Sequence, residues 1–203
     1  YPQYYAALPN SDLKQRAKAW EILWKKTIIV YIPCCFLIIS VSSLVVKLLT
    51  AKTFHHVTSY VWFGAFIELF RQLSNIAYLV SHGEKKTHNV ILPYMIGGLF
   101  LASVFFITIY KEILNINIIL TALVVAGLIT YLYNLFMVKK MINNKFDYGF
   151  LLKTLVISMP LLLPPLFLSV ENNFYILFGA GTLSGLWCLG VFYKNILYIQ
   201  EAK

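Results

Sequence analysis

Charged residues are few in this 203-residue sequence, and acidic residues are the scarcest of them. Asp and Glu number 8 against 17 Lys and Arg, and the four types together make up 12% of the chain, whereas hydrophobic residues make up 60%. A soluble domain of this length has too small an interior to hide that much apolar surface. The composition therefore excludes a soluble globular domain and predicts an integral membrane protein.

Cysteines and common catalytic motifs are also scarce. Cys34, Cys35 and Cys188 lie inside apolar runs and form no CxxC pattern, so the sequence predicts no disulfide framework. The adjacent His55 and His56 would diverge on a helix, which argues against a shared metal ion. No Gly-rich phosphate loop, HExxH or GxSxG motif occurs. We therefore expect no enzymatic activity, no metal and no cofactor.

Six hydrophobic spans follow one another, each near the ~20 residues that a helix needs to cross a bilayer. We place them at about 27–50, 57–81, 90–110, 115–138, 149–170 and 174–199. Their short links favour antiparallel neighbours. The expected fold is an all-α bundle of about six transmembrane helices, occupying residues 27–203.

Residues 1–26 are expected to form a loop and then an interfacial amphipathic helix that precedes the bundle. Leu13, Ala17, Trp20 and Trp24 recur at helical spacing, and lysines take the other side. Tryptophan is typical of the headgroup level of a membrane, and lysine is attracted to anionic lipid. We therefore expect this helix to lie at the membrane surface.

The net charge of +9 indicates membrane topology rather than nucleic-acid binding, because the basic residues lie in short loops and form no separate basic domain. Only three loop or span-end lysines fall on one side of the predicted membrane: Lys47, Lys52 and Lys111. Thirteen basic residues fall on the other side: Lys14, Arg16, Lys18, Lys25, Lys26, Lys85, Lys86, Lys139, Lys140, Lys145, Lys153, Lys194 and Lys203. The positive-inside rule then predicts that both termini are cytoplasmic.

The second span carries polar residues where hydrocarbon should be deepest. Glu68, Arg71, Gln72 and Asn75 share one side of a helix, with Gly64 one turn earlier. A charge at a bilayer centre costs ~2.5–3.5 kcal/mol, so this side must face protein or water. Either Glu68 and Arg71 form a structural ion pair, or this side of the helix lines a water-filled pathway for a polar solute. The sequence favours the pathway, because Gln72 and Asn75 extend the polar side beyond the charged pair.

A weaker polar pattern occurs in the fourth span, where Gly127, Tyr131 and Asn134 fall on one side of the helix. Tyr131 and Asn134 are further candidates for the substrate or ion pathway. Hydrogen bonds between helices are the alternative explanation for both residues, and the sequence leaves it open.

Two stretches resemble a transporter family. The first span ends in LVVKLLTAKTF, and the polar helix ends in YLVSHGEKKTHNVILPYMIG, with a turn of small, Gly, Lys and Thr residues. These features, together with the span order and link lengths, resemble the carboxyl-terminal half of the polysaccharide exporters known as O-antigen (Wzx-type) flippases. They belong to the multidrug/oligosaccharidyl-lipid/polysaccharide exporter superfamily. The resemblance is clearest from Leu69 to Lys140 and extends over nearly all of the chain.

The resemblance implies two helical lobes around a cavity that opens alternately to each side of a bacterial inner membrane. It implies transport of a lipid-linked oligosaccharide, with Arg71 neutralising a diphosphate or acidic sugar, and Gln72 and Asn75 contacting hydroxyl groups. Glu68 would set the charge state of Arg71 or bind a coupling cation. The expected partners are membrane lipids and an amino-terminal lobe upstream of Tyr1, and no nucleic acid. The alternatives are a multidrug or small-solute antiporter of this superfamily, a membrane-embedded glycan-assembly enzyme such as a polymerase, and a structural assembly subunit.

Overall fold

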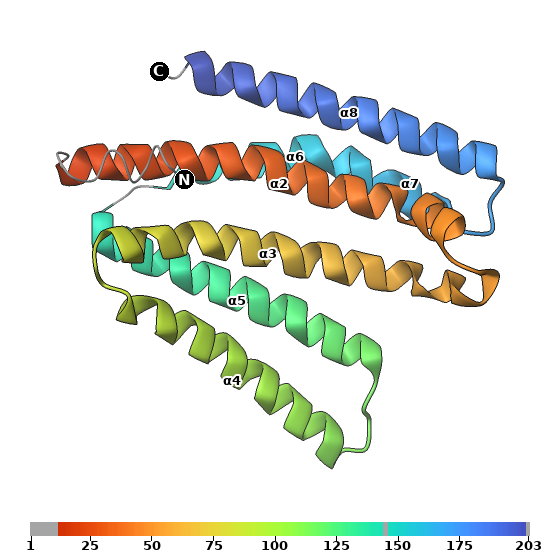
Figure 1. Ribbon diagram of the computed structural model, residues 1–203, viewed down its shortest axis with the longest axis horizontal. Coiled ribbons are helices and arrows are strands. Elements are labelled where there is room, and N and C mark those ends of the chain that lie inside the picture. Colours follow the sequence, from red (N-terminus) through yellow and green to blue (C-terminus); the bar gives the residue numbers. More distant parts are fainter. Residues whose placement is uncertain (1–11, 144–145, 202–203) are drawn as a thin grey trace. The chain divides into compact units, whose positions relative to one another are not determined.

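The computed structural model describes residues 12–143 and 146–201, and within these ranges the chain forms helices without a β-strand (Figure 1). This agrees with the all-α prediction. The elements in chain order are α2 (Leu13–Leu49), η1 (Lys52–Val57), α3 (Thr58–Gly83), α4 (His88–Tyr110), α5 (Ile116–Ile142), α6 (Tyr148–Ser158), η2 (Met159–Leu162), α7 (Leu163–Phe167) and α8 (Phe174–Glu201).

Five segments of the described chain are long and apolar enough to cross a membrane. They are Leu13–Leu49, His88–Tyr110, Ile116–Ile142, Tyr148–Phe167 and Phe174–Leu197. These segments overlap five of the six predicted spans. The remaining span, 57–81, folds as α3, which is long enough at 26 residues but is not among the five. Its polar side chains lower its hydropathy, so α3 is distinguished from the others by composition rather than by length.

Helix α2 differs from the expected boundary between an interfacial helix and a first span. It runs unbroken from Leu13 to Leu49 and contains Pro33. The Asp12 carboxylate accepts a hydrogen bond from the Gln15 backbone N–H at 2.7 Å, and the Gln15 side chain accepts one from the Asp12 N–H at 3.3 Å. This reciprocal capping box satisfies two backbone donors at the helix start. Residues 1–11 of the expected loop lie outside the described residues.

The described chain divides into two compact units, and each contains part of α2 and part of α3. The first unit combines α2 up to Trp24 with Phe70–Phe146, which includes α4 and α5. The second unit combines Lys25–Leu69 with the segment from Asp147 onward, which includes α6, η2, α7 and α8.

The core of the first unit is built around Trp20 and Trp24, which were expected at headgroup level and are instead fully buried. The two indoles stack with centroids 6.1 Å apart, and Phe146 packs edge-on against both at 5.5 and 5.7 Å. The Trp20 indole N–H donates to the Ile76 carbonyl at 3.2 Å. Because a buried indole N–H needs an acceptor, this bond lets Trp20 occupy the interior.

In the second unit, small polar side chains join α2 to α3 and α8. Ser40 and Ser184 share a hydrogen bond of 2.6 Å, and the Trp62 indole donates to Ser42 Oγ at 3.1 Å. Such contacts give hydrogen-bond partners to hydroxyl groups that would otherwise be buried without one.

The predicted fifth span, 149–170, is interrupted in this unit. Residues Met159–Leu162 adopt a 3₁₀ turn between α6 and α7, and Pro160 supplies no N–H for the Ile157 carbonyl three residues earlier. The Trp187 indole of α8 donates to that carbonyl at 3.0 Å instead. The break in the span is therefore stabilised by a bond from a neighbouring helix.

Candidate functional site

Polar residues form a stripe along one side of α3. We use the term α3 polar stripe for the residues that share this side: Gly64, Glu68, Arg71, Asn75, Tyr78 and His82. They are separated by steps of four and three residues, which keeps them on one side of a helix. The side chains on the remaining surface are mostly apolar, and Leu69, Leu73, Ile76 and Val80 are buried there. Sequence and burial therefore give α3 two opposed faces.

The stripe is open along its length. Glu68, Arg71, Tyr78 and His82 are exposed, and Asn75 is half-buried. A Cβ added at Gly64 would meet no heavy atom within 4 Å. Gln72 lies at the edge of the stripe and is half-buried. Glu68, Arg71 and Gln72 each take part in a polar, ring or electrostatic interaction, so none of the three is isolated.

Tyr131 and Asn134, the two candidates on α5, lie apart from the stripe in the interior of the first unit. The Tyr131 hydroxyl accepts a hydrogen bond from the Trp24 indole at 3.1 Å, and the Tyr131 ring stacks on Phe70 at 6.5 Å. Phe70 projects from a different side of α3 than Asn75 does, because five residues turn a helix by about 500°. The structure thus shows an interhelical hydrogen bond for Tyr131, which was the alternative explanation.

Asn134 is 3% exposed, and its side-chain Nδ2 has no hydrogen-bond partner among the described residues. It lies three residues beyond Tyr131 on the same helix. Both residues are therefore buried in the interior of the first unit, and neither lies beside the exposed polar stripe of α3.

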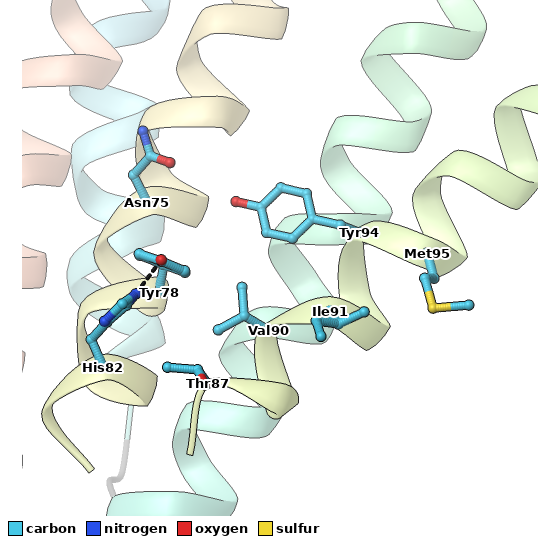
Figure 2. Close-up of a pocket in the computed structure, with 8 residues that line it drawn as sticks. All are labelled: Asn75, Tyr78, His82, Thr87, Val90, Ile91, Tyr94 and Met95. Atoms are coloured by element: carbon cyan, nitrogen blue, oxygen red, sulfur yellow. Dashed lines mark hydrogen bonds between the residues drawn. The ribbon is translucent and has the colours of Figure 1, made fainter. Parts of the chain in front are cut away.

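An open groove of about 960 Å³ lies beside the last turns of α3 in the first unit (Figure 2). Helix α3 and the start of α4 line it, with Asn75, Tyr78, His82, Thr87, Val90, Ile91, Tyr94 and Met95. The Tyr78 hydroxyl and His82 Nε2 are hydrogen-bonded to each other. The groove therefore continues the α3 polar stripe onto a second helix.

Tyr78, His82 and Tyr94 are site residues that the sequence did not predict. Tyr78 and His82 continue the spacing of Glu68, Arg71 and Asn75, so extending the pattern by two turns would have found them. Tyr94 lies on α4, so the helical spacing of residues on α3 could not have predicted it.

Each unit contains an ion pair between a basic residue of α2 and an acidic residue at the end of another helix. Arg16 Nε lies 3.3 Å from Glu84 Oε1 in the first unit. In the second unit Lys25 Nζ lies 2.8 Å from Asp147 Oδ2, and Asp147 Oδ1 accepts the Phe150 backbone N–H at 2.9 Å. The hydrogen bond from Lys25 lowers the pKa of the Asp147 carboxyl below its ordinary value of 3.8. Asp147 therefore caps α6 and pairs with Lys25 of α2.

Within the described residues, no group of three or more His, Cys, Asp and Glu side chains is placed to hold a metal ion. The arrangement instead offers an exposed row of charged, amide and aromatic groups on an otherwise apolar protein. No protein-family model, curated protein or solved structure matches the chain.

Proposed function

We propose that this chain is part of a membrane transporter that flips a lipid-linked oligosaccharide across the bacterial inner membrane. The observation that carries the proposal is the α3 polar stripe. Gly64 and His82 are 18 residues apart, which corresponds to about 27 Å along a helix. That distance is close to the ~30 Å thickness of the hydrocarbon core. A membrane protein that keeps a row of this length with two charged and several polar side chains needs an aqueous or protein environment beside it.

The residue types of the stripe suit a polar and anionic headgroup. Arg71 offers a guanidinium fork that matches the oxygen geometry of a diphosphate or carboxylate. Gln72 and Asn75 can donate to and accept from hydroxyl groups. Glu68, one helical turn before Arg71, would balance its charge or bind a coupling cation. These roles come from the resemblance to polysaccharide flippases, and we assign them to side chains on one exposed side of α3.

The proposal includes a second lobe that faces the stripe. Exposed polar groups on a helix within a membrane bundle are typical of a surface that lines a cavity. A second helical lobe, which the resemblance to polysaccharide flippases implies, would supply the opposite wall. With α3 counted as a membrane helix, the chain crosses six times, and an even number of crossings puts both ends on one side. The positive-inside rule assigns that side to the cytoplasm.

Arg71→Ala in the intact protein tests the proposal. We expect export of the lipid-linked oligosaccharide to fall by at least about tenfold, since a charge-assisted contact contributes about 1.5–3 kcal/mol. The measurement is the amount of lipid-linked oligosaccharide that reaches an impermeant glycosidase outside the inner membrane, normalised to protein abundance. Arg71→Lys should retain partial export, because it keeps the charge and loses the fork.

Lys140→Ala is the matched control, since it removes an exposed basic residue at the end of α5 that is not part of the stripe. Export that stays normal in Arg71→Ala, at normal abundance, would refute the proposed role of the stripe. Equal loss in Lys140→Ala would attribute the effect to net charge rather than to Arg71.

A further inference from the structure

The groove beside α3 and α4 has an aromatic wall on each helix. Tyr78 contributes from α3 and Tyr94 from α4, and Figure 2 shows the Tyr94 ring extending from α4 toward Asn75. Tyr78 is 37% exposed and Tyr94 is 45% exposed. Both rings therefore offer apolar surface to a molecule in the groove, and each carries a hydroxyl group that can hydrogen-bond to it.

Neutral polar groups accompany the two rings. Asn75 provides an amide with both donors and an acceptor, and Thr87 provides a hydroxyl at the start of α4. The hydrogen bond between His82 and Tyr78 restrains the orientation of the Tyr78 hydroxyl. None of the described residues that line the groove is an aspartate, glutamate, lysine or arginine.

This combination selects one class of ligand. A free phosphate or diphosphate would find no arginine or lysine in the groove to neutralise it. An acyl chain would leave the amide and hydroxyl groups without partners, which is unfavourable. A neutral sugar ring matches both properties, because it has apolar C–H faces that pack on aromatic rings and a rim of hydroxyl groups. The cavity of about 960 Å³ is large enough for more than one such ring.

We infer that the groove lined by Asn75, Tyr78, His82, Thr87 and Tyr94 binds neutral pyranose units of a glycan. The inference rests on the proposed function in taking the glycan to be the transported headgroup. It adds a site for uncharged sugars that is distinct from Arg71, which would meet the phosphate or acidic part. Arg71 and the groove residue Asn75 lie on neighbouring turns of one side of α3, so one headgroup can contact both sites.

Saturation-transfer NMR on the intact protein in lipid nanodiscs tests this site. The probes are neutral methyl glycosides of glucose, galactose, mannose, N-acetylglucosamine and rhamnose. We expect transfer to the ring protons of at least one probe. Tyr94→Ala should weaken that binding by about fivefold or more, because an aromatic contact is lost, and Tyr94→Phe should retain most of it. Asn75→Leu provides a second, independent variant, which should weaken binding by removing the amide.

Tyr175→Ala is the matched control, since it removes a tyrosine of α8 that is 80% exposed and lies in the other unit. Absence of transfer to every probe would overturn the inference, and so would binding unchanged in both Tyr94→Ala and Asn75→Leu. Photocrosslinking from a benzoylphenylalanine at position 94 that yields only phospholipid adducts, without competition by any glycoside, would identify a lipid site instead. Glycoside binding by a protein that exports nothing would refute the transport proposal alone.

Discussion

Two neighbouring glycines of α4 differ sharply in how closely other atoms approach them. A Cβ at Gly97 would collide with Thr130 Oγ1 and lie 3.1 Å from the Ala126 carbonyl oxygen, both on α5. A Cβ at Gly98 would meet no heavy atom within 4 Å. Gly97 therefore allows α4 and α5 to approach closely, as small residues do between membrane helices.

We predict that Gly97→Ala destabilises the protein by about 1–3 kcal/mol, because it overpacks the contact with α5. Gly98→Ala should be neutral or slightly stabilising, since alanine favours a helix more than glycine does. The melting temperature in one detergent, followed by size-exclusion recovery after heating, compares the two variants. Equal melting temperatures for both variants would show that α4 and α5 are not in close contact at Gly97.

The ion pair between Lys25 and Asp147 makes a prediction about pH. The pKa of the Asp147 carboxyl is lowered in the folded protein, chiefly by the hydrogen bond from Lys25. Its stabilising contribution is therefore complete above the unfolded pKa, near the ordinary value of 3.8, and is lost as the pH falls through the lower folded pKa. Asp147→Asn should melt at a lower temperature than the wild type at pH 6.

The difference in melting temperature between wild type and Asp147→Asn should shrink as the pH falls below about 4. Tyr148→Phe is a useful control, because it changes the adjacent residue without altering a charged group. A difference that stays constant from pH 6 down to pH 3 would mean that the carboxyl charge does not contribute to stability.

Helix α3 makes a prediction at the scale of an element, since its buried and open faces should differ in how a change of side-chain polarity affects folding. Leu73 is 3% exposed, and Asn75, two residues later, is half-buried in the open stripe. Leu73→Asn should lower the yield of monodisperse protein severalfold, because it buries an amide without a partner at a cost of about 1–3 kcal/mol. Asn75→Leu should leave the yield nearly unchanged.

Size-exclusion chromatography of both variants, with the amount of membrane-inserted protein measured by blotting, checks this contrast. Equal yields would contradict the assignment of a buried and an open face to α3. A loss confined to Asn75→Leu would reverse the assignment and point to a structural role for the stripe.

The elements show what sequence periodicity can and cannot predict. Long apolar runs predict the helices containing Gly97 and Tyr131, because apolar length alone marks a membrane helix. The same reasoning separated an interfacial helix from a first span near residue 27, where the structure has one helix. Amphipathic spacing at Trp20 and Trp24 has the same pattern whether the indoles face lipid headgroups or a protein core. The hydrogen-bond acceptors of the two indoles lie on α3 and α5, so the sequence around Trp20 and Trp24 cannot show which environment applies.

The candidate site was predictable only within one helix. Glu68, Arg71 and Asn75 follow from helical spacing, and the structure shows them on an exposed side. The groove required Tyr94 to lie beside the last turns of α3, which depends on the packing of α4 and not on any local pattern. Buried Tyr131 shows the converse, because a polar residue at helical spacing can find its partner, here Trp24, inside the protein.

At the scale of the whole molecule, the distribution of basic residues predicts which loops face the cytoplasm. Lys86 lies in the turn between α3 and α4, on the predicted side with thirteen basic residues, and Lys111 follows α4 on the predicted side with three. The two residues flank α4, a helix of 23 residues that is long enough to cross the hydrocarbon core. They should therefore be exposed on opposite sides of the membrane.

We predict that an impermeant maleimide added to intact spheroplasts labels Lys111→Cys and labels Lys86→Cys only after the membrane is permeabilised. Cys34, Cys35 and Cys188 are free cysteines, so each is first replaced by alanine to leave a single thiol. Opening of the membrane should raise labelling at position 86 by about tenfold or more, because the charged reagent does not cross intact hydrocarbon. Equal labelling of both positions before permeabilisation would place both ends of α4 outside and exclude a membrane crossing by this helix. Labelling of position 86 alone would invert the topology, and it would move the proposed sugar groove to the outer surface, where it would serve release of the glycan rather than its entry.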